Sequence, residues 1–501
     1  MDHLESLINS LESTTYKAFI KHLQSKNKRE DVKNITLLEI IKTNDINKLK
    51  KLYPNIQDSR AAYHALRKRL QDSLLQFLTE YRVDNQDSET LLAVQYMMLG
   101  NILVGKQLYA LANKQLLKAE VLALKTEQFS LLNEIYQLQL RFVHTYDPDQ
   151  IEALAAKMEA NQALMNQEGK LLIAYAHIRR QISNIQLQND VVNLTNVIKT
   201  AMRQYKIKLH TVLSYKSIYQ ILHIANEYAA IYQNYSLIEE YILQSSTFLE
   251  LQTTITGNQV YYRLYILYYL ANYFLRNKEF DKCNEYLALM DTLLQQQPIF
   301  KSKFDLRYRI ISALCLYYSG EAHKALAIAK DAFKVTKYVS NSEDIADLNA
   351  CMVLFYSQLN MKDCLRYLAT LTQSDIWYEK RLGLLWVIRK NLMEIVVHTQ
   401  FENTELAISR LVSFKRRYKK FLKSSGEQKV LDYIRLLEQL LLKPDIQYHH
   451  QYQVKVTALL NETANQDIFT ISFIAWLMSH WQKNSAYEIT IALVQNKYNS
   501  I

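Results

Sequence analysis

Apolar residues recur three and four positions apart along most of this chain, which is the spacing of one face of an α-helix. The pattern falls into pairs of segments of roughly 18 residues with very short turns between them, a length of about 27 Å per helix. In one pair, Leu267, Leu270 and Phe274 mark the first segment, and Phe280 and Leu287 mark the second. The sequence therefore predicts an all-α chain of consecutive antiparallel helix hairpins.

Small residues stand where the second helix of a pair must approach the first, at Ala112, Cys283, Ala325 and Cys364. The last three are 42 and 39 residues apart, which sets the period of the repeat. Together with bulky residues on the first helix, this pattern resembles the tetratricopeptide repeat family over residues 89–372. The resemblance implies a right-handed superhelical solenoid whose first helices line a concave groove, with a period longer than the family's usual ~34 residues.

Changes in the pattern predict three segments. Residues 1–85 form an N-terminal helical module that resembles the one preceding such repeats in some bacterial proteins, a resemblance that carries no function. Its longest helix is expected at 59–82, with Ser59 as the N-cap. Residues 86–375 form the tetratricopeptide-like repeat array, and residues 376–501 form further helical pairs that end in capping helices.

Composition narrows the class of protein. The 501 residues include only 7 Gly and 4 Pro, which disfavours β-rich folds and folds with Gly-rich phosphate loops. The four cysteines lie within apolar helical patterns and are expected to be buried and reduced. The longest uncharged apolar run, 468–482, has 15 residues and is too short for a membrane span. Since the N-terminus has no secretory signal pattern, a cytoplasmic location is expected.

No catalytic constellation is evident in the sequence. It contains no phosphate-binding, dinucleotide-binding, zinc-protease or nucleophile-elbow motif. His449 and His450 are the only adjacent histidines, and consecutive residues on a helix point about 100° apart, which suits a metal poorly. The sequence thus predicts a non-enzymatic protein with no cofactor and no metal site.

The strongest candidate for a binding site is a Tyr-rich set on the first helices of the array. The chain has 36 tyrosines, which are dense at 261–269, and tyrosine supplies large contact area with a polar tip. The resemblance places these residues on the groove: Tyr265, Tyr268, Tyr269, Asn272, Arg276, Arg307, Tyr317 and Asn349. The lysines of a chaperone-type carboxylate clamp are absent at the matching positions. The alternative is that the tyrosines fill the core between repeats.

A second candidate is basic. The formal net charge is +11, and residues 376–424 carry most of the excess. The last predicted helix of this segment presents a basic patch on its outer faces, made of Lys415, Arg416, Lys419, Lys420 and Lys423. Like charges at this spacing repel, so the patch either binds a phosphate backbone or an acidic protein tail, or is a solvated face. A smaller cluster, residues 67–69, lies on the predicted 59–82 helix and is a candidate DNA contact.

These features lead to two hypotheses of different classes. The first is a protein-interaction scaffold or adaptor whose groove binds a peptide or a partner helix by burying apolar side chains, with polar groups fixing the partner's backbone. The second is a nucleic-acid-associated regulator in which the basic residues contact DNA or RNA and the repeats sense a peptide. The salt dependence of binding discriminates between the two.

Overall fold

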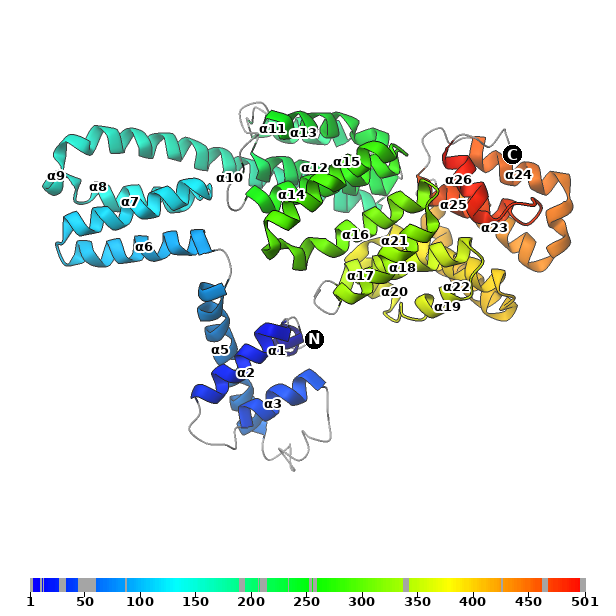
Figure 1. Ribbon diagram of the computed structural model, residues 1–501, viewed down its shortest axis with the longest axis horizontal. Coiled ribbons are helices and arrows are strands. Elements are labelled where there is room, and N and C mark those ends of the chain that lie inside the picture. The colour runs from blue at the N-terminus through cyan, green and yellow to red at the C-terminus, as the bar shows by residue number, and fades with distance from the viewer. Residues whose placement is uncertain are drawn as a thin grey trace. The chain divides into compact units, whose positions relative to one another are not determined.

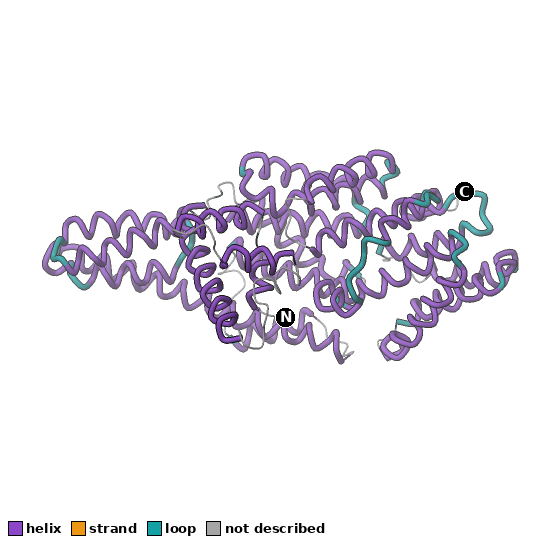
Figure 2. Tube along the Cα trace, turned by 90° about the horizontal axis from the view of Figure 1, so that it is seen from below, coloured by secondary structure: helices purple, strands orange, loops and turns teal. Residues whose placement is uncertain are grey.

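The protein is all-helical in a computed structural model that describes residues 3–9, 11, 13–26, 33–43, 60–85, 88–188, 194–205, 207, 214–232, 234–251, 255, 259–336, 342–424, 427–461 and 467–495. These ranges contain α-helices and short 3₁₀ helices and no strand (Figure 2). Internal contacts divide the chain into two compact units, residues 1–165 and 166–501. The predicted division into three segments, with boundaries after residues 85 and 375, stays a prediction.

The first unit contains two apolar cores. One core lies among the helices of residues 3–85, where Phe19 and Leu70 are fully buried. The expected helix at 59–82 is present as α5, although residue 59 lies outside the described residues. The other core centres on Ala112 and Leu116. The helices of this unit are α1 (His3–Asn9), α2 (Ser13–Lys26), α3 (Lys33–Thr43), α5 (Arg60–Asn85), α6 (Ser88–Gly105), α7 (Tyr109–Lys125), α8 (Phe129–Leu140), α9 (Val143–Tyr146) and the beginning of α10 (Ile151–Gln188).

The second unit shares one continuous apolar core. Its helices after α10 carry the labels α11 to α26 in Figure 1. Its helices pack largely in consecutive pairs, such as α14 with α15, α16 with α17, α18 with α19, and α21 with α22. The predicted small positions Cys283, Ala325 and Cys364 are fully buried, and all four cysteines are buried and free, as expected. The helices after α10 are α11 (Leu194–Gln204), α12 (Tyr215–Tyr232), α13 (Glu239–Leu251), α14 (Gln259–Arg276), α15 (Phe280–Gln296), α16 (Lys301–Tyr318), α17 (Ala322–Thr336), α18 (Ser342–Gln358), α19 (Asp363–Leu368), α20 (Asp375–Leu382), α21 (Leu384–Gln400), α22 (Thr404–Ser424), α23 (Gln428–Leu442), α24 (His450–Asn461), α25 (Ile468–Met478) and α26 (Ala486–Val494).

One turn recurs between consecutive helices. At six helix ends, a residue with positive φ donates its N–H to the carbonyl three residues back, and the next N–H donates to the carbonyl five residues back. This pattern is the Schellman motif, which satisfies the last carbonyls of a helix. The positive-φ residues are Gln107, Glu127, Lys278, Gly320, Asn360 and Glu402. The last four follow one another at intervals of 42, 40 and 42 residues, so the turn repeats with the predicted period.

The largest departure from the expected pattern is α10. It runs for 38 residues without a turn, about twice the length expected for one helix of a pair. Pro148 begins a short 3₁₀ turn directly before it, and Pro298 and Pro444 begin similar turns before α16 and α24. Proline suits these positions because the first turn of a helix has unsatisfied N–H groups in any case.

Two glycines in helix interiors are expected to respond oppositely to alanine. A Cβ at Gly100 would lie 2.7 Å from Cγ and Cδ2 of the buried Leu116, so Gly100→Ala is expected to destabilise the first unit by about 1–3 kcal/mol. A Cβ at Gly169 on α10 would meet nothing within 4 Å, so Gly169→Ala is expected to stabilise by about 0.5–1 kcal/mol. Urea unfolding followed by circular dichroism measures both, and a gain in Gly100→Ala would contradict the close packing of α6 and α7.

Candidate functional site

Four helices, α14, α16, α18 and α21, place side chains on one common side, which we call the shared face. Neighbouring helices of this set contact each other. A spacing of mostly three or four residues keeps the side chains of each helix in line. The shared face consists of Tyr268, Asn272 and Arg276 from α14; Ile311, Leu314 and Tyr318 from α16; Asp347, Cys351, Leu354 and Gln358 from α18; and Trp386, Arg389, Met393 and Gln400 from α21.

The C-terminal hairpin, α25 and α26, packs on the end of the shared face where these helices finish. The Tyr318 hydroxyl lies 2.9 Å from Oγ of Ser472, and the Gln358 amide donates to the Ser472 carbonyl at 3.1 Å. The same amide donates to Thr490 Oγ1 at 2.9 Å. These polar groups are buried, and buried polar groups need such partners. The hairpin therefore covers one end of the shared face.

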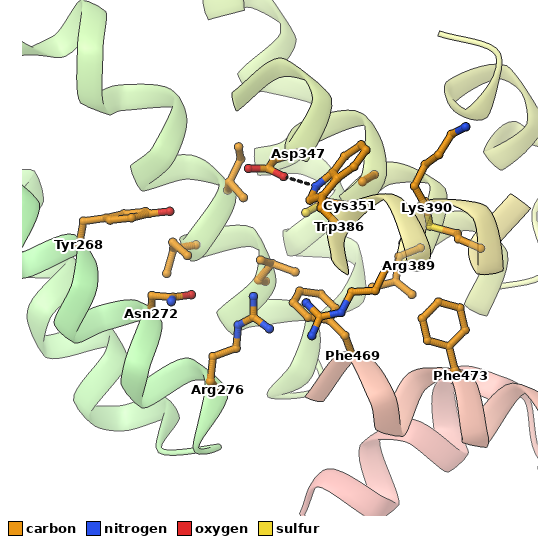
Figure 3. A pocket seen from close by; sticks show the side chains of 16 residues that line it. Tyr268, Asn272, Arg276, Asp347, Cys351, Trp386, Arg389, Lys390, Phe469 and Phe473 are labelled. Carbon is orange, nitrogen blue, oxygen red and sulfur yellow. Dashed lines mark hydrogen bonds between the residues drawn. The ribbon is translucent and has the colours of Figure 1, made fainter. Parts of the chain in front are cut away.

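A pocket of about 160 Å³ remains on the shared face beside α25 (Figure 3). Its wall is largely apolar and includes Leu314, Leu354 and Met393, together with Phe469 and Phe473 from α25. Ligand pockets typically combine such an apolar wall with a small number of polar groups that set orientation. The polar groups here are Tyr268, Asn272, Arg276, Asp347, Arg389 and Lys390.

Two arginines at the pocket share one carboxylate. Arg276 Nη1 lies 2.7 Å from both oxygens of Asp467, and Arg389 Nη2 lies 3.0 Å from Oδ2 of the same residue. The Asp467 side chain has no exposed area. Burial alone would raise the pKa of Asp467, but the two guanidinium groups hold it below its usual range. The three side chains together carry one net positive charge.

The ring of Phe469 also contacts this charged group. The Arg276 guanidinium carbon lies 4.3 Å from the Phe469 ring centroid, and that of Arg389 lies 5.9 Å away. Arginine is favourable over an aromatic face because the face is electron-rich. The pair of arginines thus binds a carboxylate and an aromatic ring from the same short segment of chain.

Asp347 forms another polar part of the pocket wall. Burial and the nearby Asp344 raise the pKa of Asp347 to about 7. The indole Nε1 of Trp386 donates to Asp347 Oδ1 at 2.8 Å, which favours the ionised form and limits this rise. Lys390 is different, because it pairs with Asp375 and Glu394 at 3.2 and 3.4 Å. Asp347 is therefore the pocket group that changes charge near neutral pH.

The structure brings four of the predicted groove residues together. Tyr268, Asn272 and Arg276 line the pocket. Arg307 lies next to them, with its guanidinium carbon 5.7 Å from the Tyr268 ring centroid and its Nε 3.0 Å from the carboxylate of Asp344.

Tyr265 and Tyr269 lie in an aromatic cluster where α12 meets α14. The Tyr265 ring lies 4.9 Å from that of Tyr219, and the Tyr269 hydroxyl lies 2.7 Å from Nδ1 of His223. Burial and the nearby Arg179 lower the pKa of His223 to about 4, so this imidazole is neutral at pH 7. Both tyrosines are buried, which matches the alternative that tyrosines fill the core between helices.

Tyr317 and Asn349 do not line the pocket. Tyr317 is fully buried, stacks on Phe355 at 4.1 Å and donates to the side chain of Gln358. Asn349 is buried and accepts a hydrogen bond from Thr370. Adjacent helix positions differ by about 100°, and the hydroxyl of the neighbouring Tyr318 lies against Ser472 at the covered end of the shared face.

Most of the residues that line the pocket were not among the predicted groove residues. Trp386, Arg389 and Lys390 lie beyond the repeats that the resemblance covers, and Asp467 and Phe469 come from a segment expected only to cap the stack. One sequence feature did point to this part of the pocket, because the basic segment 376–424 includes Arg389 and Lys390, which line it.

The predicted basic patch is exposed on α22 except at one residue. Lys415 is partly buried and pairs with Glu438. The remaining four, Arg416, Lys419, Lys420 and Lys423, are exposed and form no ion pair with the described residues. Elsewhere in 376–424 many cations have carboxylate partners, namely Arg381, Arg389, Lys390, Arg410 and Arg417. Much of the positive charge of this segment is therefore paired with carboxylates of the same chain.

In the N-terminal basic cluster, Arg67 donates to the Tyr63 hydroxyl at 2.8 Å, while Lys68 and Arg69 are exposed. Within the described ranges, no three His, Cys, Asp or Glu side chains come together as metal ligands. Among the same residues, no helix combines the length and the apolar character that crossing a membrane requires.

The fold and the pocket define an all-helical protein of packed helix pairs with a ligand-sized pocket on a face common to four helices, an arrangement compatible with a helical repeat protein. No protein-family model, no curated protein and no solved structure matches this chain.

Proposed function

We propose that this chain is a non-enzymatic, cytoplasmic scaffold or adaptor of the tetratricopeptide-like solenoid type, and that it binds a peptide or a partner helix along the shared face. The observation that carries the proposal is the pocket between α14, α16, α18, α21 and α25. It can bury one apolar side chain of the partner, and partner side chains buried in such pockets dominate the affinity of most protein interfaces.

Polar groups beside the pocket support this function. The Asn272 amide nitrogen donates to Oδ1 of Asn226 at 3.2 Å, which orients its own Oδ1 as an acceptor for a partner N–H. Tyr268 and Arg307 lie further along the same face and add a ring and a charged group. A partner bound here would bury one side chain and have its backbone direction fixed by these groups.

The test is a selection of peptides from a random display library on the intact protein, followed by affinity measurements. Ala350→Leu fills the pocket from α18, and we expect it to weaken the selected peptides at least tenfold. The matched control is Ala288→Leu on the exposed side of α15, which should bind like the wild type. The proposal fails if no peptide is enriched, or if Ala350→Leu binds as tightly as the control.

The nucleic-acid-associated regulator remains the second candidate, because Arg416, Lys419, Lys420 and Lys423 are exposed cations on one helix. A fluorescently labelled 20-nucleotide DNA or RNA titrated at 50 and 200 mM salt separates it from the first. Binding that falls steeply with salt, and that is lost when Arg416, Lys419 and Lys420 become glutamate, would favour the regulator.

A further inference from the structure

We propose that the pocket accepts a single apolar group that bears one carboxylate, with the apolar body in the cavity and the carboxylate on Arg276 and Arg389. This inference rests on the proposed binding function and adds the chemistry of the bound group. That group is either a free organic acid or the C-terminal residue of a peptide, and both sources present the same chemistry.

The size of the cavity limits the apolar body. A dry cavity of ~150 Å³ lined by aliphatic and aromatic side chains accommodates a benzene-sized molecule. The pocket here has about 160 Å³, and Ile311, Leu314 and Leu354 contribute to its wall. One phenyl or branched aliphatic group fits this space, whereas a longer peptide segment must lie outside it.

The charge of the pocket favours one anionic group. Asp467 neutralises only one of the two arginines that it contacts, so the group Arg276, Arg389 and Asp467 carries one net positive charge. An unbalanced buried charge is costly, and a monoanion beside it removes the imbalance. An apolar cavity next to one spare positive charge therefore fits a monocarboxylate better than a neutral or cationic ligand.

Arg276 also has an unused donor. Its Nε is buried and has no hydrogen-bond partner among the described residues, while its Nη1 is fully engaged with Asp467. A guanidinium has five N–H donors, and carboxylates pair with such forks through two parallel hydrogen bonds. The chain itself provides the pattern, because Asp467 and Phe469 place a carboxylate and an aromatic ring on these same arginines.

Asp347 is expected to make binding of the anion pH-dependent, since an ionised Asp347 repels a carboxylate in the same pocket. Burial and Asp344 raise the pKa of this group to about 7, so it becomes neutral below that pH. The groups that face it are Asp344 and Cys351 from α18, Tyr268 and Arg276 from α14, Arg307 from α16, and Trp386, Arg389 and Lys390 from α21. Affinity should therefore fall between pH 6 and pH 8 in the wild type and stay level in Asp347→Asn.

The experiment is isothermal titration calorimetry on the full chain with matched probes. The first pair is 3-phenylpropionate and its neutral amide. The second pair is a tetrapeptide ending in phenylalanine with a free or an amidated C-terminus. We expect at least one carboxylate to bind tenfold or more tightly than its amide. Tighter binding of the free acid identifies a small organic acid as the ligand, and tighter binding of the peptide identifies a chain end.

The decisive variant is Arg389→Met, which removes the spare charge but leaves Asp467 paired with Arg276. We expect it to lose at least tenfold in affinity for the carboxylate and to bind the amide as the wild type does. Arg381→Met, which removes an exposed arginine 3.5 Å from Glu343, is the matched control and should change neither.

Equal affinity for acid and amide, unchanged binding in Arg389→Met, or no binding of any probe at millimolar concentration would overturn the inference. If the selected library peptides still lost affinity in Ala350→Leu, the proposed peptide-binding function would remain supported. Conversely, an acid that binds while no library peptide does would support the pocket chemistry and remove the peptide-binding function.

Discussion

Replacing Asp467 by asparagine is expected to lower the free energy of unfolding of the second unit by about 3–5 kcal/mol, because removing one partner of a buried ion pair leaves the other uncompensated. The Asp467 side chain has no exposed area, and both of its oxygens are bound by Arg276, with Arg389 on one of them. An amide cannot neutralise either guanidinium, so two cations whose side chains are only 14% and 28% exposed would remain unbalanced.

The measurement is urea unfolding followed by tryptophan fluorescence, since all four tryptophans lie in the second unit. Asp331→Asn is the control, because this carboxylate also contacts two cations, Arg309 and Lys334, but is 44% exposed. Surface ion pairs contribute about 0–1 kcal/mol, so the control should shift the transition little. Equal losses in the free energy of unfolding of the two variants would contradict the expectation that Asp467 contributes more than a surface carboxylate.

The pH dependence of the same variant follows from the pKa of Asp467. The arginines hold that pKa below its usual range in the folded protein, so the pair stabilises the fold above the ordinary pKa of a free aspartate. This stability is lost as the pH falls through the folded-state pKa. Asp467→Asn should therefore be less sensitive to acid than the wild type between pH 5 and pH 2.

Asp347→Asn is expected to do the opposite and to stabilise the second unit at pH 8, by up to about 4 kcal/mol. The folded protein raises the pKa of Asp347 from 3.8 to about 7, so between these values it holds a proton that the unfolded chain has released. Wild-type stability from this group therefore falls as the pH rises from about 4 to 7 and then stays level. Asparagine has no proton to release and still offers Trp386 an acceptor oxygen.

Unfolding curves at pH 4 and pH 8 test this expectation. The difference between Asp347→Asn and the wild type should be small at pH 4 and largest at pH 8. Asp432→Asn is the control, since this exposed carboxylate pairs only with Arg435 among the ion pairs described and should show no such trend. A destabilised Asp347→Asn at pH 8 would mean that the carboxylate is ionised and well compensated in the fold.

The hairpins were predictable because their signal is repeated apolar spacing, as at Leu267, Leu270 and Phe274. The turns that join them were not. Of the six positive-φ positions in these turns, only Gly320 carries the glycine that normally identifies a Schellman turn, and Lys278 and Glu402 adopt the same backbone without it. The residue types in these turns therefore did not predict the turns, although the period of the turns agrees with that of the buried small residues.

Local helix spacing predicts some residues of the pocket, whereas other residues come from distant parts of the sequence. Tyr268, Asn272 and Arg276 share one face of one helix, so their spacing alone predicts that they point together. Nothing in that spacing reveals Asp467, which lies 191 positions from Arg276 and reaches it only because the C-terminal hairpin returns to the shared face. Tyr317 is buried in the core and does not line the pocket, and repeat spacing alone does not separate it from Tyr318, one position and about 100° away.

The return of the C-terminal hairpin also changes how the second unit holds together. In a linear stack each repeat contacts only its neighbours, and the ends can unravel while the middle stays folded. Here hydrogen bonds join Tyr318 to Ser472 and Arg276 to Asp467, across 154 and 191 positions of sequence. Such closure raises the contact order and costs loop entropy, which slows folding. It also couples α14, α16, α18 and α21 to α25, so loss of one weakens the others and the stack opens as a cooperative block.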